Sequence, residues 1–315
     1  MRCCCNRSKN NNSRGAVLLF ALVCLLALSS LVILSVGKAT REAVEARRLA
    51  AEYQADLMAE SLLDIGLELL RMDKDTLSDT PGDPWASPYA DDEFAMIIEP
   101  CNARLNVNEV LHDERVLQTL KRLLENTDIH PDNTEFLLDW LDGDSDEERV
   151  TGSEEGSYSG RWPKYKPRND DLFVPDELIL VNGFSGLDRE WVENFLTVWS
   201  EKQINLNFVS KELFEAYLPE IAVDWSRVLE WRENQGFQTK GDLTEALPEL
   251  EGDADLWKTV SDAISLRSNF FRITIEIQLP FVYERRRYIV ERNPILIDKL
   301  PEVVRGDVLK IAPND

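Results

Sequence analysis

Arg14-Gly15-Ala16-Val17-Leu18-Leu19-Phe20 opens the stretch of sequence that decides the fold. From Ala16 to Val36 the chain is apolar, and no charged residue occurs between Arg14 and Lys38. As a helix, about 21 residues extend about 30 Å, which is the thickness of the hydrocarbon core of a bilayer. The run therefore predicts a helix that spans a membrane.

A polar leader, Met1 to Gly15, precedes this helix and contains four basic residues and no acidic residue. By the positive-inside rule, these charges hold the N-terminus in the cytoplasm, so the rest of the chain is exported. A secretory signal peptide has a shorter apolar core, and its small-residue cleavage site follows that core. Here the small residue Gly15 comes first, so cleavage after it would leave a mature chain that begins at Ala16 and keeps the helix. Such a leader resembles those of type IV pilins and type II secretion pseudopilins, and an uncleaved anchor is the alternative.

The composition is that of an acidic protein with room for about two domains beyond the anchor. Hydrophobic residues make up 43% of the 315 residues, which supports packed cores. The net charge is −23, and loss of the leader would leave 31 basic and 58 acidic residues, a net charge of −27. Such a surface repels nucleic acid and anionic lipid headgroups, because Lys and Arg supply most phosphate binding. The acidic excess fits a solvated exported domain or a protein that binds cations.

The cysteines give no disulfide framework. Cys3, Cys4 and Cys5 lie in the leader, where acylation and metal binding both stay open, and Cys24 lies in the apolar run. Cys101 is alone in the exported part, so we expect no intrachain disulfide there and a role in core packing.

An amphipathic pattern continues the first helix from Thr40 to Met72. Apolar or small residues recur at every third or fourth position, with charged residues between them: Val44, Leu49, Ala50, Tyr53, Leu57, Met58, Ser61, Leu62, Ile65, Leu69 and Leu70. Together with the apolar run they predict one helix of roughly 57 residues, about 85 Å long. A rod half in the membrane and half packed on a head is the shape of a pilin's first helix. A simple stalk would instead show a linker after the membrane.

Strand patterns lie on both sides of a long helical middle. Residues 75–92 are rich in Pro, Gly, Asp and Ser and predict a loop, and Phe94–Pro100 predicts a strand. Apolar and polar residues alternate over Phe271–Leu279 and more briefly over Arg287–Arg292, which predicts an antiparallel hairpin. The fold class is therefore α+β.

The middle of the chain contains a weak internal repeat. Leu105-Asn106-Val107-Asn108 opens the first unit and Ile204-Asn205-Leu206-Asn207 the second, and each is followed by two helical segments. The second unit continues into Gly236-Phe237-Gln238-Thr239-Lys240-Gly241-Asp242-Leu243, which looks like a helix-hairpin-helix segment. Because acidic residues surround it, we expect a packing unit and no nucleic-acid binding.

Enzymatic activity has no positive support in the sequence. His112 and His130 are the two histidines, and neither is spaced to serve a Ser or Cys nucleophile or a zinc ion. No Gly-rich phosphate loop follows a predicted strand.

One acidic stretch is dense enough to suggest a metal site. It contains Asp139, Asp142, Asp144, Asp146, Glu147 and Glu148, followed by Glu154 and Glu155 and later by Asp170 and Asp171. Carboxylates that converge on one loop repel each other unless a cation neutralises them, and Ca²⁺ accepts six to eight oxygen ligands. The spacing is not that of an EF-hand, because Gly143 stands at the second position and no Gly stands at the sixth. A solvated acidic loop without metal is the alternative.

Taken together, most of the chain resembles the K-type minor pseudopilins of the type II secretion system. The most specific motifs are these: Leu137-Leu138-Asp139-Trp140-Leu141-Asp142, Gly152-Ser153-Glu154-Glu155, Tyr158, Tyr165, Asn169, Glu177-Leu178, Val181-Asn182-Gly183, Ile204-Asn205-Leu206-Asn207 and Ser268-Asn269-Phe270-Phe271. Ser153-Glu154-Glu155 departs from the usual Ala-Glu-Asp, which puts in doubt which of the two carboxylates binds metal.

The resemblance implies a pilin core of one long helix and a small antiparallel sheet, split by a large inserted all-helical domain. The expected segments are a leader (1–15), a transmembrane part (16–37), the first part of the pilin core (38–102), an insert with two weakly repeated units (103–268) and the C-terminal strands (269–315). It also implies a calcium site whose candidate ligands are Asp139, Asp142, Asp144, Glu154 and Glu155, with Asp170 and Asp171 as further candidates.

The resemblance further implies a place and a set of partners. Phe20 stands five residues after Gly15, where most pilins carry a Glu that pairs with the N-terminal amine of a neighbouring subunit; K-type members commonly lack it. We therefore expect a non-enzymatic tip subunit, single-pass in the inner membrane with a periplasmic head. The expected partners are the I- and J-type minor pseudopilins, the major pseudopilin, the prepilin peptidase, the inner-membrane assembly platform and membrane lipid. The alternatives are a minor type IV pilin, a membrane-tethered calcium-dependent adhesin, and a membrane-anchored hydrolase.

Overall fold

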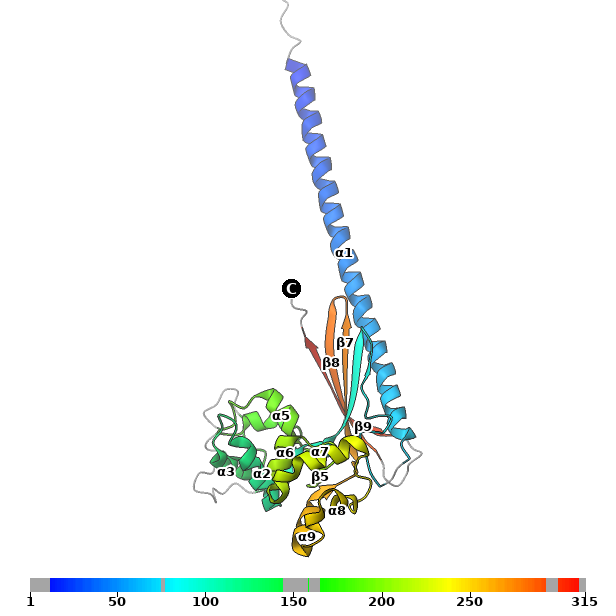
Figure 1. Cartoon of the computed structure of the whole chain (residues 1–315). Coiled ribbons are helices and arrows are strands. Elements are labelled where there is room, and N and C mark those ends of the chain that lie inside the picture. The colour runs from blue at the N-terminus through cyan, green and yellow to red at the C-terminus, as the bar shows by residue number, and fades with distance from the viewer. Residues whose placement is uncertain (1–11, 75–76, 144–157, 159–164, 293–299, 312–315) are drawn as a thin grey trace, which may run out of the picture.

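Helix α1 (Asn12–Met72) forms a rod that projects far beyond the rest of the molecule (Figure 1). The computed structural model describes residues 12–74, 77–143, 158, 165–292 and 300–311. By length and composition, Gly15–Met72 is long and apolar enough to cross a membrane, and none of its most apolar window is buried. Because a soluble surface rarely leaves such a long apolar segment uncovered, this half of α1 is suited to anchor the chain in a membrane.

The other half of α1 packs on a five-stranded antiparallel sheet with the order β1-β2-β7-β8-β9. Its buried residues recur at helical spacing and face isoleucines of β7: Ala55, Ala59, Leu62 and Leu70. Gly66 lies at a close approach of the helix to the sheet, since a Cβ there would be 3.1 Å from Ile273 Cδ1 and 3.2 Å from Met96 Sδ. Small residues on this face therefore let the rod lie directly on the sheet.

The strands confirm the predicted α+β fold and add to the predicted strands. Strand β1 (Tyr89–Ala90) pairs with β2 (Phe94–Pro100), and β2 pairs with β7 (Phe270–Leu279) from Phe94↔Ile277 to Pro100↔Phe271. Strand β8 (Val282–Glu291) is longer than the predicted hairpin arm, because three consecutive arginines hide its alternation. Strand β9 (Glu302–Ile311) was not predicted, since Gly306 interrupts its pattern and a register shift opposite Ile289/Val290 breaks the alternation.

A second group of elements lies between β2 and β7 and has its own hydrophobic core. Its helices are α2 (Glu114–Leu124), α3 (Thr134–Leu141), α5 (Arg189–Phe195), α6 (Lys211–Tyr217), α7 (Trp225–Asn234), α8 (Asp242–Ala246) and α9 (Ala254–Ala263). Its 3-10 helices are η1 (Cys101–Ala103), η2 (Val107–Leu111), η3 (Pro131–Asn133), η4 (Pro175–Leu180), η5 (Pro219–Asp224) and η6 (Pro248–Leu250). We expected helices alone, but two parallel strand pairs occur: β3 (Leu105–Asn106) with β4 (Leu196–Thr197), and β5 (Ile204–Asn205) with β6 (Ile264–Ser265).

The repeated Asn motif has the same local role in both places. The Asn106 side chain accepts a hydrogen bond from the Asn108 N–H at 3.1 Å, and the Asn205 side chain accepts one from the Asn207 N–H at 3.0 Å. Such Asx bonds turn the chain immediately after each two-residue strand. The similar sequences therefore encode similar strand-to-turn corners.

Candidate functional site

The first candidate ligands lie at the end of helix α3. Residues 137–141 are all buried, so the core of the insert covers this short helix on nearly all sides. Asp139 is completely buried, and Asp142 is the half-buried residue that follows the last turn. Two predicted ligands thus sit at the C-terminal end of one helix.

A second segment brings two further candidates to the same end of α3. Asn169 adopts a left-handed conformation (φ 53°), and its N–H donates to the Trp140 carbonyl oxygen at 3.0 Å. Asp170 and Asp171 follow at once and are exposed. The structure therefore places the segments that carry Asp139, Asp142, Asp170 and Asp171 side by side, whereas Asp144, Glu154 and Glu155 lie outside the described residues.

Three aromatic rings form the wall behind this region. Tyr158 is fully buried, with its ring centroid 5.2 Å from that of Trp140 and 5.5 Å from that of Tyr165. The Tyr158 hydroxyl accepts a hydrogen bond from the Asn182 N–H at 3.1 Å, and the Tyr165 hydroxyl donates to the Leu180 carbonyl oxygen at 2.8 Å. These motif residues therefore anchor the acidic segment to the core.

The chemistry of the donor set fits a hard cation. The four described candidates offer carboxylate oxygens, which are the ligands that Ca²⁺ prefers, and no soft sulfur or imidazole ligand accompanies them in the described segments 137–143 and 168–173. The indole Nε1 of buried Trp140 has no hydrogen-bond acceptor within the described part of the chain. Its fluorescence should therefore be sensitive to any rearrangement of this region.

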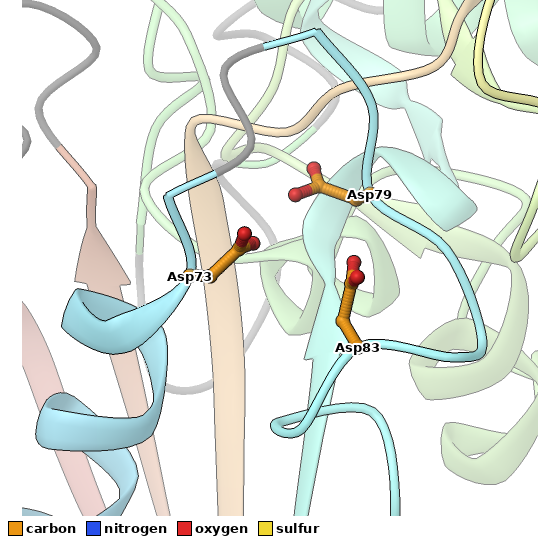
Figure 2. A group of neighbouring side chains, drawn as sticks. All are labelled: Asp73, Asp79 and Asp83. Carbon is orange, nitrogen blue, oxygen red and sulfur yellow. The ribbon is translucent and has the colours of Figure 1, made fainter.

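A second cluster of carboxylates lies where α1 ends, and it was not predicted, because residues 75–92 indicated only a loop. Side-chain oxygens of Asp73, Asp79 and Asp83 all lie within 4.8 Å of one another (Figure 2). The guanidinium of Arg292 donates to Asp73 at 2.8 Å and to Asp79 at 2.5 Å. An arginine thus supplies positive charge to this cluster, and it does so from 219 positions further along the chain.

Asp79 is the most deeply buried acid of the cluster. It has no exposed surface, and this burial raises the pKa of its carboxyl group to about 6, against the opposing effects of Arg292 and of the Ser268 N–H. The Ser268 N–H donates to the Asp79 carboxylate at 2.5 Å.

The helix-hairpin-helix segment packs against the loop that carries Asp79. Gly236 has a φ of +70°, and a Cβ there would lie 3.0 Å from the side chain of Thr80. The amide of Asn207 bridges the two parts, because its Nδ2 donates to the Asp79 carbonyl oxygen at 2.8 Å and to the Phe237 carbonyl oxygen at 2.9 Å. Gly236 therefore allows the hairpin to pack closely against the loop that carries Asp79.

A second ionic junction joins the insert to the sheet on the side of helix α5. The Glu193 carbonyl oxygen accepts hydrogen bonds from Arg104 at 2.9 Å and from Arg272 at 3.0 Å, and its carboxylate accepts one from Arg287 at 2.6 Å. Burial alone would raise the pKa of Glu99 nearby, but Arg104 and Arg272 hold that pKa below its ordinary value. The insert is therefore fixed to the sheet at two separate places.

Comparison with known proteins finds similarity to the same family that the sequence motifs resemble. Residues 103–201 match the family model of type II secretion system protein K. Type II secretion system protein K of Pseudomonas aeruginosa is 25% identical over 224 residues, which are 66% of this chain and 65% of that protein, slightly less than two thirds of its length.

A solved structure has the same fold. A chain in the crystal structure of the GspK-GspI-GspJ complex from the enterotoxigenic Escherichia coli type 2 secretion system superposes with a TM-score of 0.66 and 18% sequence identity, covering 84% of this chain and 99% of that chain. The predicted resemblance to the K-type family and the predicted pilin-like fold are confirmed by these matches.

Proposed function

We propose that this protein is a minor pseudopilin at the tip of a periplasmic pseudopilus. The match of residues 103–201 to the family model of type II secretion system protein K supports this proposal. One observation carries the proposal: α1 passes without a break from its uncovered apolar half to the half that packs on the sheet. The head is thus rigidly joined to the membrane helix, as a subunit extracted whole into a filament requires. The protein is a non-enzymatic assembly component.

The proposed mechanism is initiation of filament assembly. After cleavage behind Gly15 by a prepilin peptidase, the mature helix begins at Ala16 in the inner membrane, and the head lies in the periplasm. Phe20 replaces the Glu that would pair with the amine of a subunit above it, which fits a subunit with nothing above it. The assembled tip then supports export of folded proteins across the outer membrane.

Minor pseudopilins of the I and J types are the partners we propose, as the similar E. coli chain lies in a complex with GspI and GspJ. The major pseudopilin and the inner-membrane assembly platform would follow during elongation. Where α1 leaves the apolar run and begins to pack on the sheet, exposed apolar residues recur at helical spacing, among them Leu49 (56%), Tyr53 (66%) and Leu57 (47%). This face points away from Ala55 and Ala59, which face the sheet, so it can receive partner helices.

Co-purification tests the proposed function. We expect the full chain, captured from detergent-solubilised membranes of its own cells, to retain the two minor pseudopilins, and Tyr53→Glu to lose most of them. Gln54→Glu adds the same charge one position away, on another face of the helix, and should retain them. Capture of type IV pilus subunits would instead support a minor type IV pilin, and capture of neither would leave the adhesin.

We also propose that the acidic region of the insert binds calcium through Asp139, Asp142, Asp144, Glu154 and Glu155, with Asp170 and Asp171 as further ligands. Support comes from the convergence of the segments 139–142 and 169–171 and from their all-carboxylate donor set. Bound Ca²⁺ would neutralise acids that otherwise repel one another, and it would thereby stabilise this part of the insert.

Calcium titration of the full chain in detergent micelles tests this site. We expect millimolar Ca²⁺ to raise the melting temperature. For a chain of this size, each 1 kcal/mol of stabilisation by binding should raise it by at most about 4 °C. Tryptophan fluorescence, to which Trp140 contributes, should change over the same concentrations. Asp142→Ala should blunt both responses, whereas Glu251→Ala, at an exposed position outside the region, should leave them intact. An unchanged melt at millimolar calcium would contradict the proposal.

A further inference from the structure

The end of α1, the start of β7 and the insert meet at one buried ion-pair network centred on Arg292. Arg292, Asp79 and Asp73 are 7%, 0% and 8% exposed. Besides its bonds to the two carboxylates, the Arg292 guanidinium donates to the Ser268 carbonyl oxygen at 3.0 Å, and the Trp85 indole N–H donates to Asp73 at 3.0 Å. The Asp79 carboxylate therefore reaches bulk water only when the junction opens locally.

In the part of the chain that the structure describes, the charged groups that act on the Asp79 carboxylate include the Arg292 guanidinium and the Asp73 carboxylate. The end of α1 contributes Asp73, the following loop contributes Asp79 and Asp83, and the end of β8 contributes Arg292. The segment before β7 contributes the uncharged Ser268, and the insert contributes the uncharged amide of Asn207. Asp79 thus shares the Arg292 guanidinium with Asp73, and buried acids that share a site disfavour simultaneous ionisation.

Asp79 is the most deeply buried acid of this cluster, and it is also an acid that contacts the insert. Its backbone N–H donates to the Leu266 carbonyl oxygen at 2.6 Å, its carbonyl oxygen accepts from Asn207, and its carboxylate accepts from Ser268. Asp83 is half-buried and already accepts from the Thr80 N–H at 2.7 Å. Opening of the junction would return the Asp79 carboxyl group to water.

We propose that this junction is a proton-responsive lock, in which uptake of a proton by Asp79 tightens the attachment of the insert to the pilin core. The proposal concerns the orientation of the insert and does not depend on the proposed function.

The sign follows from the two states of Asp79. In the closed junction its pKa is raised from 3.8 to about 6, whereas in the opened junction it returns toward the ordinary value. The closed state therefore binds the proton more tightly. The resulting stabilisation of the closed junction is complete below the ordinary pKa of 3.8. That stabilisation is lost as the pH rises through about 6. Two pKa units correspond to roughly a hundredfold change in the opening equilibrium.

Hydrogen exchange of the full chain in detergent micelles tests the lock. The reporters are junction amides: the N–H groups of Asp79, Ser268 and Phe237, the last of which donates to the Asn207 side chain at 2.8 Å. After correction for the intrinsic rate, we expect their protection to fall by about a hundredfold as the pH rises from below 4 to 8, with most of the fall complete near 6. The Ile275 amide in the central strand β7 should not follow this curve.

Three variants make the result specific. Asp79→Asn should abolish the pH dependence, and Asp73→Asn, which removes the neighbouring like charge, should move the upper end of the fall to lower pH. Asp188→Asn, at the N-terminus of the remote helix α5, should change nothing at the junction. Junction protection that is flat in pH, or equally steep in Asp79→Asn, would overturn the proposal. If Asp79→Asn failed to fold, Asp73→Asn would still test the proposal, because an unshifted pH curve in that variant would overturn it.

Discussion

Gly15→Val is expected to leave the leader on the chain and to reduce secretion to the level of cells that lack the protein. A prepilin-type cut requires a small residue before the scissile bond, and a retained leader adds four positive charges that hold the N-terminus in the cytoplasm. N-terminal sequencing of the membrane-bound chain should give Ala16 for the natural protein and Met1 for the variant, and export of a folded substrate reports the function.

Gly37→Val is the matched control for this experiment. Gly15 and Gly37 both lie on the uncovered part of α1, where a Cβ added at either glycine would have no heavy atom within 4 Å, so neither valine disturbs the packing of the head. The control should be cleaved and should secrete normally. A natural chain that begins at Met1, or a Gly15→Val chain that secretes normally, would establish the uncleaved anchor in place of a processed pilin helix.

Arg292→Met is expected to destabilise the protein by about 3–5 kcal/mol at pH 7.5, because it removes the cation that pairs with buried Asp73 and Asp79. Methionine preserves contact with the Phe271 ring, over which the guanidinium lies at 4.7 Å from the centroid. Chemical denaturation of the full chain in micelles measures the loss. The loss should shrink as the pH falls, since the already raised pKa of Asp79 rises further without the guanidinium and the folded state then gains from protonation.

Arg285→Met provides the comparison at a partly exposed ion pair. Arg285 donates to Glu276 at 2.7 Å on the sheet surface, and the two side chains are 34% and 35% exposed. Its loss should cost less than about 1 kcal/mol and should vary little with pH. Equal losses for the two variants would show that the Arg292 network contributes no more than a surface pair.

The long helix and the central strands could be predicted because their patterns are local. An uncharged run of membrane length, the apolar spacing up to Leu70 and the alternation over Phe271–Leu279 each depend on neighbouring residues. Strand β9 escaped prediction because its place in the sheet depends on pairing with β8. The exposed valines of β9 carry little pattern, since the edge of the sheet leaves them half in water.

The two acidic clusters likewise differ in whether their residues are neighbours in the sequence. Asp139 and Asp142 stood out because many carboxylates follow one another in the sequence, and the structure places the segment of Asp170 and Asp171 beside them. Asp73, Asp79 and Asp83 are spread through an ordinary polar loop, and Arg292 meets them only when the sheet has formed. No local pattern distinguishes a solvated aspartate from one that will be buried by a distant arginine.

The position of the insert also predicts an order of events during folding. Pro100 of β2 pairs with Phe271 of β7, 171 positions later, so closing this loop from an unfolded chain costs about 3 kcal/mol more than closing a four-residue turn. The Asn102 side chain donates to the Arg267 carbonyl oxygen at 2.9 Å, which shows that the two ends of the insert meet when it folds. Once the middle of the chain has its own core, β2 and β7 are held as near neighbours and the sheet can form as if across a hairpin. We therefore expect the head to be completed late, from its two ends, around a middle that folds first.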